Sequence, residues 1–223
     1  MPGESSRIPE PVVERLCRYH RYLSRAVRSG IVRVPSQALA AMTGATPEQV
    51  RKDLSHFGAF GQRGVGYDTA HLRDQIRHIM GLDTPRRVAI IGAGHLGTAL
   101  AGYPGFEARR FEIAGLYDSN PSRVGHSVQG LRVRSIGSLA DDCQAQKVDI
   151  AIIAVPEGAA QAVADHAVAA GIHAVLSFAP VTLELPEDVV VRYVDMTSEL
   201  EFLSFWIEHG AENSVEHRNR RER

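Results

Sequence analysis

Cysteine, tryptophan and long apolar runs are scarce in this 223-residue sequence, which contains two cysteines and one tryptophan. Cys17 and Cys143 are far apart and match neither a disulfide framework nor a zinc-ligand pattern, so a reducing compartment is favoured. No uncharged apolar run approaches the roughly 18 residues that would cross a bilayer. The N-terminal segment also lacks the pattern of a secretory signal peptide. We therefore expect a cytoplasmic protein that has no membrane-spanning segment and binds no metal.

Net charge is nearly absent as well, but the two parts of the chain differ in sign. The whole sequence has a formal charge of −1. Residues 1–80 hold eleven arginines and one lysine against seven acidic residues, a balance of +5, and the remaining residues balance at −6. A basic first part indicates a polyanionic partner such as nucleic acid. Ordinary variation in an arginine-rich sequence would give the same imbalance, so charge alone leaves both readings open.

The first part of the chain has the pattern of consecutive amphipathic helices. Apolar residues recur at three- and four-residue steps from about residue 9 to residue 28, and arginines follow the opposite face. Gly30 is typical of the end of that helix. Ser36 and Gly44 are the residue types expected at the start and the end of a second helix.

A third helix has the clearest start signal in the chain. Thr46 is suited to the N-cap, proline follows it, and Gln49 stands at the reciprocal capping position. The glycine-punctuated segment 58–67 then predicts a tight hairpin with Arg63 near its tip. Helices followed by such a hairpin are typical of a winged helix-turn-helix domain, which we assign to residues 1–80.

The third helix, which we expect to reach about residue 56, has one face suited to contacting DNA. The spacing of Val50, Leu54 and Phe57 directs these side chains inward. The residues turned outward are Arg51, Lys52, Ser55 and His56. In a helix-turn-helix domain such side chains reach base edges or phosphates in the major groove, and Arg63 on the hairpin can enter a minor groove. The alternative for each is a solvated surface residue, and His56 could instead pack against the helix end.

The rest of the chain alternates short β-branched runs with helical segments. Strand candidates lie at residues 88–91, 111–117, 150–155, 174–176 and 189–194. Nearly continuous apolar strands separated by helices predict an α/β fold with a parallel sheet covered on both faces. Gly81 and Pro85 mark a hinge. We assign residues 81–197 to this domain, residues 198–210 to a C-terminal apolar helix, and residues 211–223 to a tail that is too polar to pack and is expected to be disordered.

A glycine-rich turn gives this second domain its chemistry. Gly92-Ala93-Gly94-His95-Leu96-Gly97 follows the first strand and opens a helix, which is the context of a Rossmann-type dinucleotide-binding turn. Asp118 stands 21 residues after Gly97, at the end of the next strand, where a carboxylate can bind an adenosine ribose. Asp118 favours NAD over NADP, although Arg123 lies close enough to keep NADP open. A purely structural glycine turn is the other possibility.

Catalytic residues are not indicated. Only 28 residues follow Asp195, too few for a substrate-binding domain. The candidate bases in this part are His95, His126, His166 and His173, and none has a carboxylate at a matching position. We therefore expect that a bound dinucleotide is sensed by the protein and is not consumed in a reaction, and that the protein is not an enzyme.

Three segments resemble the Rex family of redox-sensing transcriptional repressors. They are VRKDLSHFGAFGQRGVGYD from Val50, IGAGHLGTALAGYPGF from Ile91 and FAPVTLELPEDVVVRYVD from Phe178. The resemblance covers roughly residues 8–207. It implies a homodimer with an N-terminal winged helix, a central NAD(H)-binding Rossmann domain and a C-terminal helix exchanged between subunits. It also implies repression of respiratory and fermentative genes from palindromic operators and release from DNA when NADH binds, whereas NAD+ competes for the site without releasing DNA.

The same resemblance implies residues that connect the two domains. Arg21, Tyr103 and Asp195 match positions at which the Rex family links cofactor binding to DNA binding, although the sequence does not say which pairing belongs to which state. Around the nicotinamide we expect Tyr103 together with the apolar residues Val155, Pro156, Ala179 and Pro180. An alternative function remains open: a small NAD-dependent oxidoreductase, or a nucleotide-binding module such as a CoA-binding domain, with a basic helical appendage.

Overall fold

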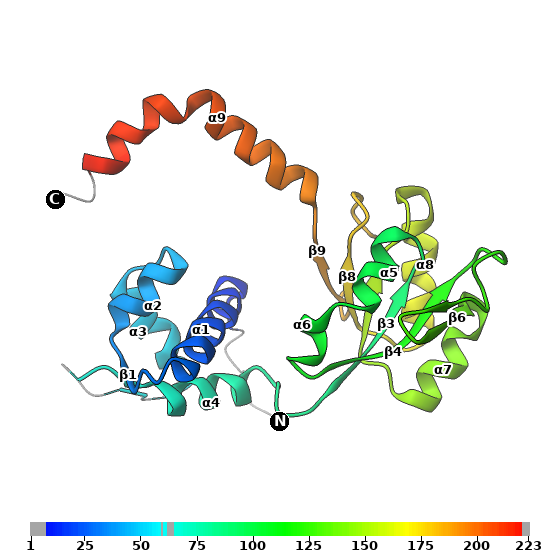
Figure 1. Cartoon of the computed structure of the whole chain (residues 1–223), viewed down its shortest axis with the longest axis horizontal. Coiled ribbons are helices and arrows are strands. Elements are labelled where there is room, and N and C mark those ends of the chain that lie inside the picture. The colour runs from blue at the N-terminus through cyan, green and yellow to red at the C-terminus, as the bar shows by residue number, and fades with distance from the viewer. Residues whose placement is uncertain (1–7, 59, 62–64, 220–223) are drawn as a thin grey trace. The chain divides into compact units, whose positions relative to one another are not determined.

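The structure is a computed structural model that describes residues 8–58, 60–61 and 65–219, without the side chains of residues 211–219. The chain divides into two compact units, residues 1–84 and 85–223 (Figure 1). The division lies shortly after the boundary expected at residue 80. Each unit is described by itself below.

The first unit is mainly helical. Its elements are α1 (Glu10–Arg28), β1 (Arg33–Val34), α2 (Ser36–Thr43), α3 (Pro47–Ser55), β2 (Tyr67–Asp68) and α4 (Thr69–Ile79). Leu16, Tyr19 and Leu23 on α1 are fully buried at helical spacing, and they share one core with Leu72 and Ile76 of α4. Burial of this apolar stripe is the main stabilising contribution to so small a unit.

The start of α3 is as predicted, but the start of α2 is not. The Thr46 hydroxyl accepts a hydrogen bond from the Gln49 backbone N–H at 3.1 Å, which caps α3. The Gln49 side chain does not complete a capping box, because it donates to Asp53 one turn further along the helix. At α2 the N-cap is Pro35, which has no side-chain cap, and Ser36 is already helical. Gly44 ends α2 in the left-handed conformation that glycine adopts without strain.

The segment 58–67, which is predicted to form a hairpin, ends in a strand. Its last residues form β2, which pairs with β1 in an antiparallel register, with Val34 opposite Tyr67. The second strand of the wing therefore pairs with a segment that precedes α2. A non-local partner of this kind has no signal in the local pattern. Arg63 lies outside the described residues.

The second unit is an α/β domain that ends in a long helix. Its elements are β3 (Arg86–Ile91), α5 (His95–Ala101), α6 (Pro104–Glu107), β4 (Phe111–Asp118), β5 (Ser127–Val128), β6 (Leu131–Ser135), a 3-10 turn (Ile136–Ser138), α7 (Leu139–Gln146), β7 (Ile150–Ile153), α8 (Glu157–Ala169), β8 (Ala174–Ser177), β9 (Val190–Tyr193) and α9 (Met196–Asn219). The strands form one sheet of order β5-β6-β4-β3-β7-β8-β9, in which only the β5–β6 pair is antiparallel. The parallel sheet predicted from the alternating pattern is confirmed.

Two apolar clusters cover the two faces of this sheet. On one face, residues of α7 and α8, such as Cys143 and Ala164, pack against Ile91 and Ile153. On the other face, Leu100 of α5 and Phe106 of α6 pack against the remaining core strand residues. Because β3 lies between β4 and β7, its carboxyl end is at the centre of the sheet, where the glycine-rich turn begins.

Two parts of the second unit differ from what the sequence predicted. The β5–β6 hairpin was not expected; its turn places Gln129 and Gly130 at φ of 51° and 77°, the type I′ pattern. The tail expected to be disordered is helical as far as Asn219, so α9 is longer than the predicted helix at 198–210 (Figure 1). Residues 211–219 lack proline, and glutamate, arginine and alanine are compatible with a helix. In the part of the chain that the structure describes, no helix has the length and hydrophobicity needed to span a membrane.

Candidate functional site

The glycine-rich turn after β3 is held by close backbone contacts. Gly92 has φ of +108°, and a Cβ there would collide with the carbonyl oxygen of Ala154. A Cβ at Gly97 would collide with the carbonyl oxygen of Gly92. The turn therefore lies directly against the end of β7 and the first turn of α5, and its backbone is accessible to a ligand without intervening side chains.

Asp118, the last residue of β4, holds this turn in place through a set of three hydrogen bonds, the Asp118 latch. Its Oδ2 accepts the backbone N–H of Ala93 at 2.8 Å and Nη1 of Arg123 at 3.1 Å, and its Oδ1 accepts the backbone N–H of Asn120 at 2.7 Å. Asp118 is only 6% exposed. Burial by itself would raise its pKa, but the N–H groups of Asn120 and Ala93 and the guanidinium of Arg123 lower the pKa below its ordinary value. The group is therefore a carboxylate at neutral pH.

A cavity of about 460 Å³ opens at the carboxyl ends of β3, β4 and β7. This volume and position suit a ligand bound at the switch point of an open α/β sheet. The predicted residues that line it are Gly92, Gly94, His95, Leu96, Asp118, Val155 and Pro156. The glycine turn without a Cβ, the ionised carboxylate and the apolar wall are together suited to a dinucleotide that has a phosphate, a ribose and a flat ring.

Some predicted cofactor residues do not line this cavity. The backbone N–H of Ala93 donates to Asp118, and Gly97 packs against Gly92. Both residues therefore stabilise the shape of the turn and do not line the cavity. Tyr103, Ala179 and Pro180 are absent from its lining. Ala179 is buried in the core, whereas Pro180 and Tyr103 are exposed. The sequence reasoning missed other lining residues, among them Ser119, Asn120, Ile136, Ala159 and Phe178, although several directly follow the ends of parallel strands.

The three residues expected to connect the domains have separate surroundings. Tyr103 precedes α6, is 56% exposed, and packs edge-on against Phe106 with ring centroids 5.2 Å apart. Asp195 caps α9 by accepting the backbone N–H of Thr197 at 2.8 Å and the hydroxyl of Ser198 at 2.6 Å. Hydrogen bonding from Ser198 and Thr197 lowers the pKa of Asp195. Arg21 is exposed on α1, in the other unit.

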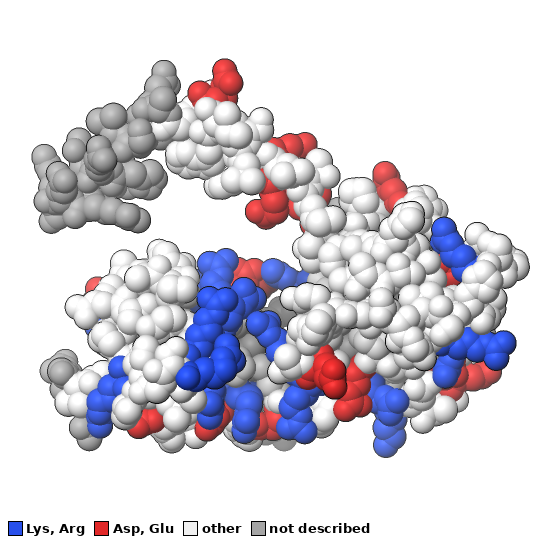
Figure 2. Space-filling view, in the orientation of Figure 1, with Lys and Arg blue, Asp and Glu red and all other residues white. Residues whose placement is uncertain are grey.

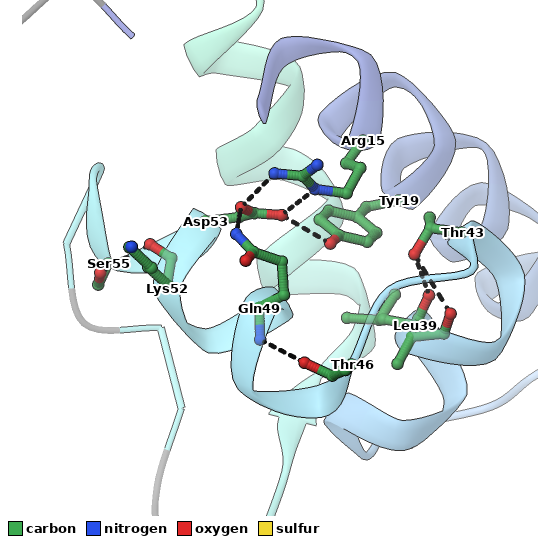
Figure 3. Close-up of polar contacts among 10 residues, drawn as sticks. Arg15, Tyr19, Leu39, Thr43, Thr46, Gln49, Lys52, Asp53 and Ser55 are labelled. Carbon is green, nitrogen blue, oxygen red and sulfur yellow. Dashed lines mark hydrogen bonds and ion pairs between the residues drawn. The ribbon is translucent and has the colours of Figure 1, made fainter. Parts of the chain in front are cut away.

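The outer face of α3 is the candidate nucleic-acid interface. Arg51, Lys52, Ser55 and His56 are all exposed, as the spacing predicted. The Ser55 hydroxyl donates to the backbone carbonyl of Lys52 at 2.7 Å, and Lys52 and Ser55 lie together at one end of α3 (Figure 3). Figure 2 shows basic side chains gathered over the helical unit, with some acidic side chains beside them.

A hollow of about 840 Å³ lies beside this face and contains an arginine that the sequence reasoning missed. Arg33 of β1 and Arg51 of α3 both line it. Nη1 of Arg51 donates to the hydroxyl of Ser36 at 3.2 Å, so the guanidinium leans toward the start of α2. Two arginines at one concave surface add to the positive field that a phosphate backbone would meet.

The described residues offer little support for a metal site or for a catalytic histidine. Among the side chains that the structure describes, those of residues 8–58, 60–61 and 65–210, no three of His, Cys, Asp or Glu come together in a way that could hold a metal ion. Of the histidines considered as bases, His166 contacts the backbone carbonyl of Ala162 and His173 contacts Asp188. Neither lines the cavity beside the glycine turn; His95 does, within the turn itself.

Comparison with protein families gives one match in each unit. A family model described as a CoA binding domain matches residues 83–181. A second model, described as a putative DNA-binding protein N-terminus, matches residues 7–55.

Comparison with individual proteins gives matches over nearly the whole chain. A redox-sensing transcriptional repressor Rex of Roseiflexus sp. (strain RS-1) is 42% identical over 94% of this chain and 94% of that protein. The protein of the same description from Thermus thermophilus is 43% identical over 90% of this chain and 94% of its own. A crystal structure of RSP, described as a Rex-family repressor, has a TM-score of 0.85 and 34% identity over 93% of this chain and 97% of its own. RSP has also been solved with β-NADH, and with β-NAD+ and operator DNA.

Proposed function

This chain belongs to the Rex family of redox-sensing transcriptional repressors, and we propose that it binds palindromic operator DNA as a homodimer and leaves it when NADH binds. It is a regulator and not an enzyme. The observation that carries the proposal is the pairing of a latched glycine turn in one unit with an exposed basic helix in the other, within a chain similar to Rex proteins from end to end. A cytoplasmic location and control of respiratory and fermentative genes complete the proposal.

NADH and NAD+ are the ligands that we place in the cavity of the α/β unit. The complexes of RSP with both cofactors support this assignment. We assign the pyrophosphate to the turn from Gly92 to Gly97 and the adenosine ribose to the region of Asp118. Tyr103, Val155, Pro156, Ala179 and Pro180 are proposed for the nicotinamide end. An apolar environment there disfavours the positive ring of NAD+ through loss of its hydration, and so favours NADH.

DNA is the proposed ligand of the helical unit. We assign Arg51, Lys52, Ser55 and His56 to the major groove, and Arg63 remains a prediction for the wing. The exposure of the four helix residues and the operator complex of RSP support this assignment. Two such helices in a homodimer would meet half-sites one or more helical turns apart.

The alternative of a small oxidoreductase, or of a nucleotide-binding module with a basic appendage, is not retained. The relatives that match both units are named as repressors, not as enzymes. The match to the CoA binding domain model is confined to the α/β unit, so it describes that fold and leaves the helical unit unexplained.

The proposal is tested by a mobility shift with a palindromic duplex selected by this protein from random-sequence DNA. We expect NADH to release the duplex and NAD+ to leave it bound. By linkage, the duplex should weaken NADH binding by the same factor as NADH weakens duplex binding. Binding that ignores NADH, or the absence of any selected duplex, would refute the proposal.

Alanine at Arg51 or at Lys52 should weaken binding to the selected duplex. Loss of a base contact costs about 1–3 kcal/mol, which is roughly 5- to 150-fold in affinity, and loss of a phosphate contact lowers the salt dependence by about one charge. Titrations at several salt concentrations measure both effects. Arg28→Ala, which removes an exposed arginine at the end of α1, is the matched control. If Arg51→Ala and Lys52→Ala bind the duplex as tightly as the control Arg28→Ala does, α3 is not part of the interface with DNA.

Alanine at Asp118 should weaken NADH and NAD+ by the same factor. The carboxylate latches the turn that both cofactors would meet, and hydrogen bonds to charged groups contribute about 1.5–3 kcal/mol each, so a loss of about tenfold or more is expected. Calorimetric titration with each cofactor measures the two affinities.

Tyr103→Phe is the contrasting variant. It removes only the hydroxyl at the proposed nicotinamide end, so it should change how strongly NADH releases DNA. The assignments of Asp118 to the adenosine ribose and of Tyr103 to the nicotinamide would be wrong if Asp118→Ala changed the NADH/NAD+ affinity ratio and Tyr103→Phe left DNA release unchanged.

A further inference from the structure

The inner side of α3, which faces away from the proposed DNA-binding residues, contains a buried charged residue. Asp53 is fully buried, and its carboxylate accepts four hydrogen bonds, two at each oxygen (Figure 3). Oδ1 accepts Nη2 of Arg15 at 2.8 Å and Nε2 of Gln49 at 2.7 Å. Oδ2 accepts Nε of Arg15 at 2.6 Å and the hydroxyl of Tyr19 at 2.9 Å. The carboxylate is therefore saturated by protein groups.

Three of these four hydrogen bonds come from α1, where Arg15 and Tyr19 lie one turn apart. The Arg15 side chain is 20% exposed, whereas Arg18, Arg21 and Arg25 of the same helix are exposed. Arg15 thus directs its charge inward, to another helix. Its two parallel N–H···O bonds form a bidentate pair, which fixes both the distance and the relative plane of the two groups.

Asp53 is held on the side of α3 opposite to the proposed DNA-binding residues. It immediately follows Arg51 and Lys52 in a helix of nine residues. Successive residues of an α-helix are related by about 100° of rotation, so fixing Asp53 against α1 also fixes the directions in which Arg51 and Lys52 project. The apolar neighbours Val50 and Leu54 bury this side of α3, but dispersion contacts have little angular preference.

From this geometry we propose that Arg15, Tyr19 and Asp53 form a positioning network that sets the rotation of α3 and thereby the affinity for operator DNA, without touching DNA. The inference rests on the proposed DNA-binding function. A buried ion pair is weak support for stability as such, because apolar residues of similar volume often replace one at no cost. What apolar residues do not reproduce is the fixed plane of a bidentate pair.

The protonation state agrees with this role. Burial by itself would raise the pKa of Asp53, but the hydrogen bonds of Arg15, Gln49 and Tyr19 lower the pKa below its ordinary value. Asp53 is therefore ionised at neutral pH and accepts all four hydrogen bonds.

The test replaces the whole network by apolar residues in the full chain, as Arg15→Met with Tyr19→Phe and Asp53→Leu. Affinity for the selected palindromic duplex should fall by about tenfold or more, which is the effect of one misplaced base contact, while NADH affinity stays unchanged. Thermal unfolding and circular dichroism show whether the variant is folded at the temperature of the titration. The triple variant removes one positive and one negative group, so the net charge of the chain is unchanged and the wild type is its reference. Arg18→Met shows what loss of an exposed arginine of α1 does by itself.

Duplex affinity of the folded triple variant equal to that of the wild type would overturn the proposal. If the triple variant does not fold, Arg15→Lys decides, because it keeps the charge at a partly exposed position and loses the bidentate geometry. It should weaken duplex binding at unchanged NADH affinity, and wild-type duplex affinity would again overturn the proposal. Failure of the wild-type chain to bind or release the duplex refutes the proposed function instead, so the two failures are distinguishable.

Discussion

Alanine at Gly97 will shift the response to NADH to roughly 5- to 150-fold higher NADH concentration while operator binding persists. The added Cβ would collide with the carbonyl oxygen of Gly92, and both are part of the turn assigned to the pyrophosphate. Because the obstructing atom belongs to backbone, α5 must move away from β3. Overpacking of this kind costs about 1–3 kcal/mol, or roughly 5- to 150-fold in affinity where the strain is relieved by distorting the turn.

Calorimetric titration with NADH and mobility shifts across an NADH series measure the two consequences. Gly158→Ala is the matched control, because a Cβ at Gly158 would meet nothing within 4 Å and its φ is not positive. The helical unit is unchanged in either variant, so the selected duplex should be retained at wild-type affinity. Normal NADH release in Gly97→Ala would show that the cofactor does not use this turn.

Deleting the chain after Met196 will yield a monomer with greatly reduced operator affinity. The described part of α9 exposes large apolar side chains, with Leu200 at 66% and Ile207 at 84%, and Leu203 and Phe205 are also exposed. Burying each such side chain in a partner subunit contributes about 1.5–3 kcal/mol. We propose that a second copy of this chain covers them. A monomer engages one half-site, and losing the linked second contact costs about 100- to 10,000-fold in affinity.

Sedimentation velocity gives the oligomeric state, and mobility shifts with the full palindrome and with one half-site give the DNA effect. A chain that ends at Gly210 is the control, because it keeps the apolar side chains and removes only the polar end of α9. That shorter chain should remain dimeric. A dimer that survives deletion after Met196 would place the interface on another surface.

Local chemistry made several elements predictable from sequence. The threonine cap of α3, the glycine end of α2 and the glycine turn after β3 each depend on residues within a few positions, and the structure confirms them. The parallel sheet followed from buried, nearly continuous apolar strands. The β5–β6 hairpin was missed because the edge strand β5 has only two residues, and because the turn is Gln-Gly and not the commoner Asn-Gly.

The sequence indicates that Asp53 lies on the buried side of α3, but it does not identify the residue that pairs with Asp53. Residues 50, 53, 54 and 57 follow the inward spacing of a helix, so a carboxylate at 53 stands where apolar residues are expected. Such a group needs a buried cation or several donors. Arg15 borders the apolar stripe of α1 more closely than the other arginines of that helix do, but which residue it meets depends on how two helices cross. The glycine motif alone does not predict the cavity lining at Phe178 and Ile136, because these residues follow other strands whose carboxyl ends meet at the same edge of the sheet.

The latch at Asp118 has a consequence for what the sensor measures. All three donors to this carboxylate belong to the protein, so the shape of the turn is set by the chain itself and is offered identically to both redox forms of the cofactor. A preorganised site spends little free energy on ordering, and whatever it does spend is common to the two ligands. Common contributions cancel when NADH and NAD+ compete. When the two forms together saturate the site, the fraction of sites that holds NADH therefore depends on the ratio of the two forms and not on the total pool.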